Sequence, residues 1–387
     1  MSGIPRKIQD TGHASRAAVR HPARRAQDGR IAQLRLKFRI AISVLEDRMQ
    51  PLPLLPTMGV GSYASPGWFV SGRARMREGD FGPADIDEMF EDATRLAIAD
   101  QIEAGLDIVS DGELHRQRFV FEMFQHLQGL KRVAPGRKLG VPGYDMAPHF
   151  MVESAVTAPR GLGVIGEFQT LKRLAPGRHL KVALPGPVTF AGFMTLGRHD
   201  VGETIDALIG IVRSELEDLA AAGADYVQLD EPGLPETPLG LSLDDCVAVI
   251  NRTLAGFAFR RGVHVCFGNN AGRPMADRDI ARLMPGLVAL KADEISLEFA
   301  NREMAQVEVM AELARRFDVA AGVIDVKNFR LEPKEAVAQR IELCLKHVPA
   351  DRLRLTADCG FSALPRGLAR RKMIALVDGA RMVRSAR

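Results

Sequence analysis

Asp-Tyr-Val-Gln-Leu-Asp at positions 225–230 and Gly-Val-His-Val-Cys-Phe at positions 262–267 are two apolar runs of strand length. Between them, residues 243–260 place apolar side chains at helical spacing, and Gly262 follows directly as a stop signal. Two strands joined through a helix lie parallel and are connected by a right-handed crossover. This stretch therefore predicts an α/β protein built on a parallel sheet.

The same alternation of strand and helix patterns runs along the rest of the chain. Its 387 residues suffice for one large barrel or for two ordinary domains. Eight repeated units favour a closed (β/α)8 TIM barrel. The alternative is an open doubly wound sheet, and the lack of a Gly-rich phosphate loop after the first strand counts against it. The predicted strands are 56–62, 107–110, 180–185, 225–230, 262–267, 294–299, 319–325 and 353–358.

The gap between the second and third predicted strands, residues 111–179, is longer than a crossover helix requires. It contains a helical pattern at about 117–129, followed by a stretch rich in Gly and Pro. We therefore expect an insertion after the second strand of the barrel.

The N-terminal segment differs from the rest in charge and composition. Residues 1–48 hold eleven Lys and Arg against four Asp and Glu, a net charge of +7. Because the whole chain carries +4, the remainder carries −3. We predict a basic, disordered leader over residues 1–50 and a catalytic barrel over 51–387. The acidic balance of the barrel argues against nucleic acid as a partner.

Cysteine content and hydropathy set two further expectations. The four cysteines, at positions 246, 266, 344 and 359, are too few for a disulfide framework and fit a reducing, cytoplasmic setting. No apolar run reaches the length of a membrane span, so we expect no transmembrane helix.

Unusual polar residues recur where the predicted strands end. Barrel enzymes carry their reactive groups at the carboxyl ends of the strands, so this recurrence predicts one central site. The residues are Ser62, Asp111, Glu113, Asp230, Glu231, His264, Cys266, Glu298, Asp325, Lys327, Asp358 and Cys359.

His264 and Cys266 form the most informative pair among these residues. Residues i and i+2 of a strand point to the same face, so the imidazole and the thiol can hold one metal ion. Cys359, from another strand end, can add a second thiolate. One His and two Cys would leave zinc an open position, as a catalytic site requires, and this suggests chemistry on a thiol. Without Cys359, a buried cysteine used for packing and a hydrogen-bonded histidine would explain the pair better than a metal site.

Carboxylates near the same strand ends suggest that the site also binds a charged group of the substrate. Asp230 and Glu231 are adjacent in a strand, so one faces the pocket and the other does not, and we expect Asp230 to face inward. Together with Glu113 it would suit a cationic amine of a substrate. Ion pairs at the barrel rim are the alternative reading.

The ordered set of motifs resembles the cobalamin-independent methionine synthase family, specifically its C-terminal catalytic barrel. The similarity runs from about Pro56 to near the C-terminus. It implies zinc as the cofactor and a methyltransferase that converts homocysteine to methionine. The motifs that carry it are Val60-Gly61-Ser62, Asp111-Gly112-Glu113, Gly186-Pro187-Val188-Thr189, Leu229-Asp230-Glu231-Pro232, His264-Val265-Cys266, Glu298 and Asp358-Cys359-Gly360.

The resemblance also implies roles for individual residues. Zinc ligands in the family are His, Cys, Glu and Cys, which match His264, Cys266, Glu298 and Cys359. The amino acid group of homocysteine is held by a Ser and two carboxylates. These match Ser62, Glu113 and Asp230.

Two departures concern the methyl donor. Where the family has a proton-shuttling His after the seventh strand, this chain has Lys327, and Phe193 replaces a Trp that packs on the pterin. The chain also lacks the second barrel of full-length members and resembles the single-barrel ones. A folate or a corrinoid methyl carrier therefore remains open as donor.

Other functions stay open at this stage. The first alternative is zinc-dependent alkyl transfer between a thiol such as coenzyme M and an epoxide. Zinc-dependent hydrolysis and simple zinc binding are the others.

Overall fold

The computed structural model describes residues 51–387, except 117–118, 137–145 and 270–271. The predicted disordered leader, residues 1–50, lies outside the described residues. In the described part of the chain, no helix combines the length and the apolar character that crossing a bilayer requires.

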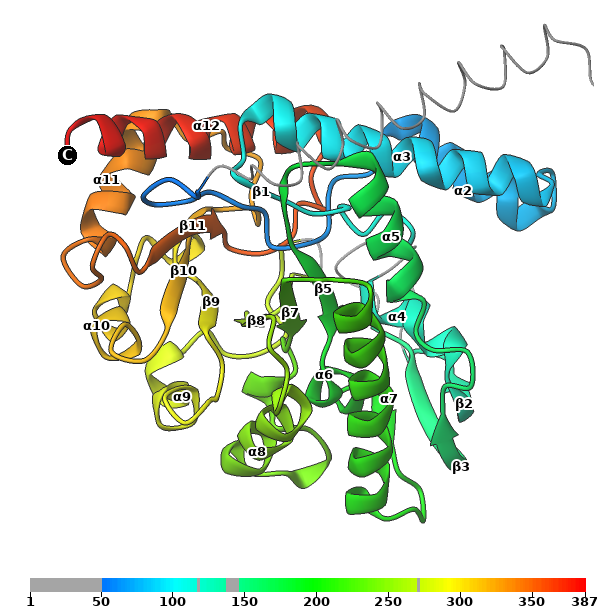
Figure 1. Cartoon of the computed structure of the whole chain (residues 1–387). Helices are drawn as coiled ribbons and strands as arrows, with labels where there is room; N and C mark the ends of the chain where they lie inside the picture. The colour runs from blue at the N-terminus through cyan, green and yellow to red at the C-terminus, as the bar shows by residue number, and fades with distance from the viewer. Residues whose placement is uncertain (1–50, 117–118, 137–145, 270–271) are drawn as a thin grey trace, which may run out of the picture. The chain divides into compact units, whose positions relative to one another are not determined.

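A parallel sheet forms the centre of the described part of the chain (Figure 1). Six of its strands pair in the order β11-β10-β9-β8-β7-β5, and β1 pairs with β4, all in parallel register. Most residues of these strands are buried on both faces, as expected for a sheet covered by helices. The strands are β1 (Ile108–Val109), β4 (His179–Leu180), β5 (Val182–Pro185), β7 (Tyr226–Asp230), β8 (Arg260–Val265), β9 (Glu294–Glu298), β10 (Asp318–Ile324) and β11 (Leu353–Ala357).

Thr57 and Met58 close the sheet into a ring. Thr57 bridges to Leu355 of β11 and Met58 bridges to Ile108 of β1, both in parallel. β4 leads directly into β5, so the ring returns to the six-stranded sheet. The predicted (β/α)8 barrel is thus confirmed, with its strands in chain order.

The first strand is shorter than predicted. Residues 56–62 contribute only the two isolated bridges, not a continuous strand. Two buried side chains explain this, because they occupy carbonyl groups that a ladder would otherwise use. Lys181 Nζ donates to the Gly59 carbonyl at 2.7 Å, and Gln228 Nε2 donates to the Val60 carbonyl at 3.0 Å.

Helices follow most strands and surround the sheet in Figure 1. The sequence places their ends: Ser242 and Asp245 form a capping box at the start of α8, and Gly105 ends α3 in the left-handed conformation. The helices around the barrel are α2 (Gly67–Glu78), α3 (Pro83–Ala104), α6 (Pro187–Ala191), α7 (Val201–Ala221), α8 (Leu243–Leu254), α9 (Ile280–Leu287), α10 (Met310–Leu313), α11 (Lys334–Cys344) and α12 (Arg366–Ser385).

Residues 302–316, after β9, do not form one continuous helix. Glu303, Met304 and Gln306 have φ values of 54°, 62° and 61°, which no α-helix accommodates. Short 3-10 turns therefore replace the start of the helix, and only α10 remains. The 3-10 turns after β7 and β9 are η2 (Leu234–Glu236), η3 (Pro238–Gly240), η4 (Ala300–Arg302) and η5 (Val307–Val309).

The predicted insertion lies between β1 and β4. Its helical part is shorter than the expected 117–129, because the chain turns into a strand at Gln128. β2 and β3 form an antiparallel pair, and β6 (Met194–Thr195) joins β3 in parallel. The insertion consists of α4 (Phe119–Met123), η1 (Phe124–His126), β2 (Gln128–Val133), β3 (His149–Thr157) and α5 (Val164–Leu174).

Gly322 in β10 leaves the space that Asp358 occupies beside it. A Cβ at this position would lie 2.8 Å from Asp358 Cα and 3.0 Å from the Leu297 carbonyl oxygen. Both are backbone atoms, so relieving the contact would require the neighbouring backbone to shift. We expect Gly322→Ala to lower the free energy of unfolding by about 1–3 kcal/mol, the usual cost of overpacking. Urea denaturation would measure it.

Gly210→Ala in α7 is the matched control. Nothing lies within 4 Å of a Cβ built at Gly210, and the residue is helical and exposed. Alanine should therefore stabilise the protein by about 0.5–1 kcal/mol through helix propensity. Equal effects of the two substitutions would contradict the assigned role of Gly322.

Candidate metal centre and active site

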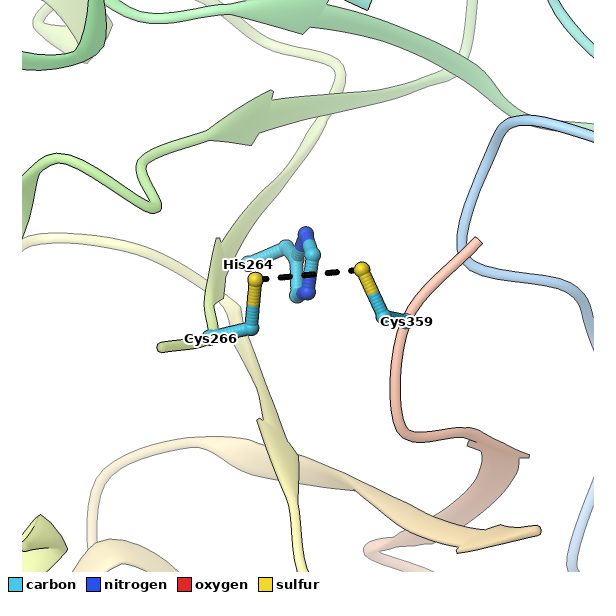
Figure 2. A group of neighbouring side chains, drawn as sticks. All are labelled: His264, Cys266 and Cys359. Atoms are coloured by element: carbon cyan, nitrogen blue, oxygen red, sulfur yellow. Dashed lines mark hydrogen bonds between the residues drawn. The ribbon is translucent and has the colours of Figure 1, made fainter. Parts of the chain in front are cut away.

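Three potential metal ligands meet at the carboxyl end of the barrel. His264 lies in β8, Cys266 directly follows this strand, and Cys359 follows β11 (Figure 2). A ring nitrogen of His264 and the two sulfur atoms all lie within 4.8 Å of one another. His264 and Cys266 are buried, and Cys359 is partly accessible. The barrel thus brings together two cysteines that lie 93 positions apart in the chain.

The spacing of these atoms suits a tetrahedral metal ion. The Sγ atoms of Cys266 and Cys359 lie 3.9 Å apart. Tetrahedral zinc with Zn–S bonds of about 2.3 Å separates two thiolate ligands by roughly 4 Å. Nitrogen and sulfur are also the donor types that zinc prefers.

His264 is oriented by a buried chain of hydrogen bonds. Its Nδ1 lies 2.9 Å from Asp230 Oδ1, which also accepts a 2.7 Å bond from Gln228 Nε2. Gln228 in turn accepts a 2.7 Å bond from Lys181 Nζ. Nδ1 is thereby committed to Asp230, and Nε2 has no partner among the described residues. A buried, unpartnered nitrogen beside two thiols fits a metal ligand.

The thiols of Cys266 and Cys359 differ in pKa because their surroundings differ. A hydrogen bond from Cys266, helped by the nearby charges of His264 and Lys327, outweighs burial and lowers the pKa of Cys359 to about 7. The same hydrogen bond, together with burial, raises the pKa of Cys266 well above its ordinary value. Cys359 is therefore the thiol that ionises first.

Asp358 anchors the loop that carries Cys359. Its carboxylate accepts hydrogen bonds from the backbone N–H groups of Phe299, Ala300 and Asn301, at 2.9, 2.9 and 2.6 Å. These bonds tie the end of β11 to the turn after β9. The position of Cys359 is consequently fixed by the backbone of the turn after β9 and not by its own loop alone.

Glu298, the fourth ligand that the family resemblance implies, is paired with a buried lysine. It ends β9, and its Oε2 lies 2.5 Å from Lys327 Nζ in a pair whose side chains are 0% and 3% exposed. The group of donor atoms within 4.8 Å does not include its carboxylate. Both charges nevertheless act on Cys266 and Cys359, so the pair lies beside the metal centre.

Ser62 and Glu113 border the same space. A Cβ on Gly360, next to Cys359, would lie 2.4 Å from Ser62 Oγ, and a Cβ on Gly61 would lie 2.1 Å from Glu113 Oε1. Burial raises the pKa of Glu113 to about 8. The negative charge of Asp230 adds to this rise, which places the two carboxyl groups near each other.

Glu231 points away from the site, as strand alternation predicts. Its carboxylate accepts hydrogen bonds from the backbone N–H groups of Val188 and Thr189 at 3.2 and 2.7 Å. It thus fixes the start of α6, while its neighbour Asp230 orients His264. Burial raises the pKa of Glu231 to about 8.

Phe193 lies on the insertion side of the barrel. Its ring packs edge-to-face on Phe121 of α4 with centroids 4.7 Å apart. Its carbonyl accepts a 2.8 Å hydrogen bond from the backbone N–H of Phe150 in β3. The structure therefore groups it with the insertion and not with the three sulfur and nitrogen donors.

Three further buried residues support the site and were not predicted from the sequence: Arg116, Lys181 and Gln228. Arg116 is buried and makes a bidentate pair with Glu167 of α5, and its Nη1 lies 3.6 Å from Glu113 Oε2. Lys181 and Gln228 could have been found from the sequence, because each is a polar residue within an otherwise apolar run. Each is a polar group that burial would penalise unless it had a partner.

We expect Asp230→Asn to weaken metal binding by about 10–100-fold, the usual effect of losing a carboxylate that orients a histidine ligand. The amide can donate to Nδ1 and so shift the ring proton to Nε2, the nitrogen that faces the sulfurs. Competition with a chromophoric chelator would measure the affinity. Glu231→Gln is the control: it should lower stability but leave the metal affinity unchanged, and equal losses in both variants would contradict the role of Asp230.

Comparison with known proteins gives consistent matches. The family described as "Cobalamin-independent synthase, Catalytic domain" matches residues 55–382. The methionine synthase of Saccharolobus solfataricus is 28% identical over 338 residues, which is 87% of this chain and 97% of that protein. A B12-independent methionine synthase from Shewanella sp. W3-18-1, solved with selenomethionine, is 27% identical at a TM-score of 0.72, covering 86% of this chain and 99% of that one. A methyltransferase from Methanosarcina mazei, 14% identical, shares the fold at a TM-score of 0.55, covering 89% and 97%.

Proposed function

Since the chain belongs to the family of cobalamin-independent synthase catalytic domains and is a methyltransferase, we propose that its acceptor is the thiol of homocysteine and its product methionine. The observation that carries this proposal is the group His264, Cys266 and Cys359, with its unpartnered Nε2 and its 3.9 Å sulfur separation. The relatives named methionine synthase support the choice of acceptor.

We assign zinc to this group, with His264, Cys266 and Cys359 as ligands and Glu298 as the fourth ligand that the family resemblance implies. When bound, the ion would lower the pKa of a substrate thiol, ordinarily near 8.5, and so supply a thiolate at neutral pH. The two cysteine thiolates would balance the double positive charge of the ion, so a substrate sulfur held there would keep the electron density that it needs to attack a methyl group. Thiol ligands that must stay reduced also fit a cytoplasmic setting.

Ser62, Glu113 and Asp230 are proposed to hold the amino acid part of homocysteine. Asp230 Oδ1 is committed to His264 and Gln228, so its other oxygen is the one assigned to the ammonium group. Glu113 shares its buried space with Arg116 and has a raised pKa. An ammonium group nearby would favour its ionised form, and the two would bind each other more strongly in this low-dielectric setting.

The donor side is assigned to Lys327 and Phe193. Lys327 would place positive charge near the donor or leaving group, and Phe193 would offer an apolar ring to the donor. A folate or a corrinoid carrier fits this proposal, and donor assays separate the two.

The test combines metal analysis with a panel of donors. Zinc content is measured first, and the protein is then mixed with homocysteine and methylated folate, methylcobalamin or an epoxide. Methionine formed with either methyl donor supports the proposal. A thioether formed only from the epoxide would replace it with alkyl transfer. Hydrolytic activity without thiol consumption would overturn both.

A further inference from the structure

Arg116 and Glu113 lie in the loop after β1, which borders the proposed acceptor site. Glu113 has a φ of 56°, a left-handed conformation that glutamate rarely adopts. The backbone N–H of Arg116 donates to the Glu113 carbonyl at 3.0 Å and closes the loop on itself. Strained backbone of this kind is found where a side chain is held for a function, so this loop fixes Glu113 at a conformational cost.

The guanidinium of Arg116 is shared between two carboxylates. Its Nε and Nη2 donate to Glu167 of α5 at 2.6–3.1 Å, and Nη2 also donates to the Ala183 carbonyl at 2.6 Å. Its Nη1 has no hydrogen-bond partner among the described residues and lies 3.6 Å from Glu113 Oε2, which is likewise unpartnered there. The pair with Glu167 therefore fixes the arginine and leaves Nη1 available to Glu113.

Glu113 lies among several charged groups of both signs. Burial raises its pKa to about 8, and nearby carboxylates add to this rise. The positive charge of Arg116 acts in the opposite direction and favours the ionised form. The carboxylates come from the same loop, from α5 and from β7: Asp111, Glu167 and Asp230.

Lys181, a second cation that interacts with Glu113, cannot take the place of Arg116. Its Nζ already donates to the Gly59 carbonyl and to Gln228 Oε1, both at 2.7 Å. Burial also lowers the pKa of Lys181 to about 8, whereas an arginine keeps its charge at any pH of interest. Arg116 is therefore the permanent positive charge beside Glu113.

The charge of Glu113 decides what the acceptor site can bind. As a carboxylate, it can neutralise an ammonium group in a low-dielectric space, where the attraction is much stronger than in water. As a neutral acid, it would leave the ammonium group buried without a counter-charge, which is strongly unfavourable. Whatever keeps Glu113 ionised therefore favours acceptors that carry an ammonium group.

We infer that Arg116 is a positioning residue that holds Glu113 as a carboxylate facing the acceptor site, and that the enzyme thereby selects thiols with an ammonium group. Glu167 of α5 anchors Arg116 and, because it shares the positive charge, weakens this effect. The insertion, which supplies Glu167, thus reaches the substrate through one buried ion pair. The inference rests on the proposed function, in which Glu113 binds the ammonium group of homocysteine.

The test compares two thiols that differ only in the amino group, L-homocysteine and 4-mercaptobutyrate, on the full chain supplied with zinc. Isothermal titration calorimetry in a reducing buffer gives the Kd of each thiol without a methyl donor or turnover. The measurements run from about pH 6 to about pH 8.5, across the pKa of about 8 for Glu113. The ratio of the two Kd values removes the titration of the thiol, which both ligands share.

Arg116→Gln removes the positive charge, and Glu167→Gln removes the carboxylate that competes for it. At neutral pH, Arg116→Gln should reduce the preference for homocysteine about tenfold or more, the effect of one unit in the pKa of Glu113, and should move the rise of this preference to higher pH. Glu167→Gln breaks the same ion pair but should move the rise to lower pH, because Glu113 loses a neighbouring negative charge. Arg116→Lys keeps the charge and should retain most of the preference.

The opposite directions distinguish control of charge from structural damage, which would affect both glutamine variants alike. If Arg116→Gln does not fold, the shift to lower pH in Glu167→Gln decides the question. Profiles that shift in the same direction, or an unshifted profile in Glu167→Gln, would overturn the inference and leave homocysteine as the proposed acceptor. Equal Kd values for the two thiols in the wild type at every pH would overturn the assignment of Glu113 to an ammonium group, and the inference with it.

Discussion

Replacing Cys266 or Cys359 by serine will strip the protein of zinc and abolish methyl transfer. The two sulfurs lie 3.9 Å apart around one point, and a serine hydroxyl is a far poorer zinc ligand than a thiolate. The loss of affinity should exceed the 10–100-fold that a missing partner of a ligand causes, and so reach about 100-fold or more. Zinc content after gel filtration and methionine formation are the two measurements.

Cys344→Ser provides the matched control for this prediction. Cys344 is fully buried in α11 and lies outside the group of metal donors. Its replacement should lower stability modestly and leave zinc content and activity per folded molecule as in wild type. Full zinc content in Cys266→Ser or Cys359→Ser would refute the metal centre.

Replacing Arg116 by methionine should destabilise the fold more than any other single side-chain change discussed for this barrel. Arg116 donates to both oxygens of Glu167 at 2.6–3.1 Å and to the Ala183 carbonyl at 2.6 Å. Its removal leaves Glu167 and Glu113 buried without their cation. Breaking a buried ion pair in this way costs about 3–5 kcal/mol. Urea denaturation at neutral pH would measure the change in the free energy of unfolding.

Arg173→Met is the control that separates the effect of burial from the effect of losing an ion pair. Arg173 also pairs with a glutamate, Glu91, at 2.7 Å, but the two side chains are 53% and 37% exposed. Exposed pairs contribute only about 0–1 kcal/mol, so this variant should remain close to wild type. Similar losses in both variants would mean that burial of the Arg116 pair has no special weight.

The loss of unfolding free energy in Arg116→Met, relative to wild type, should grow with pH. Burial raises the pKa of Glu113 from 4.5 to about 8 and also raises that of Glu167. A group with a raised pKa in the folded state contributes stability below its unfolded pKa and loses it as pH rises through the folded value. Without the arginine these pKa values rise further. The variant should therefore be closest to wild type near pH 5 and furthest from it above pH 8.

Much of the barrel could be predicted because its signals are local. Apolar runs of strand length and helical periodicity extend over five to twenty residues, and each reflects burial of one face by its own segment. β7, β8, β9 and β11 accordingly fall within a few residues of the predicted strands. The first strand could not be placed in this way, because the side chains of Lys181 and Gln228, from other strands, occupy its carbonyl groups.

The fold class and the residue types at the strand ends can be derived from the sequence alone. Both follow from short-range patterns and from the rule that reactive groups of a parallel barrel lie at the carboxyl ends of its strands. Which side chains meet depends on the folded chain. Folding closes the ring through Thr57 and Met58, brings Cys359 to Cys266 and joins Glu298 to Lys327. Such partners depend on strand register and on how each buried charge finds its counter-charge, and neither is encoded in any single stretch of chain.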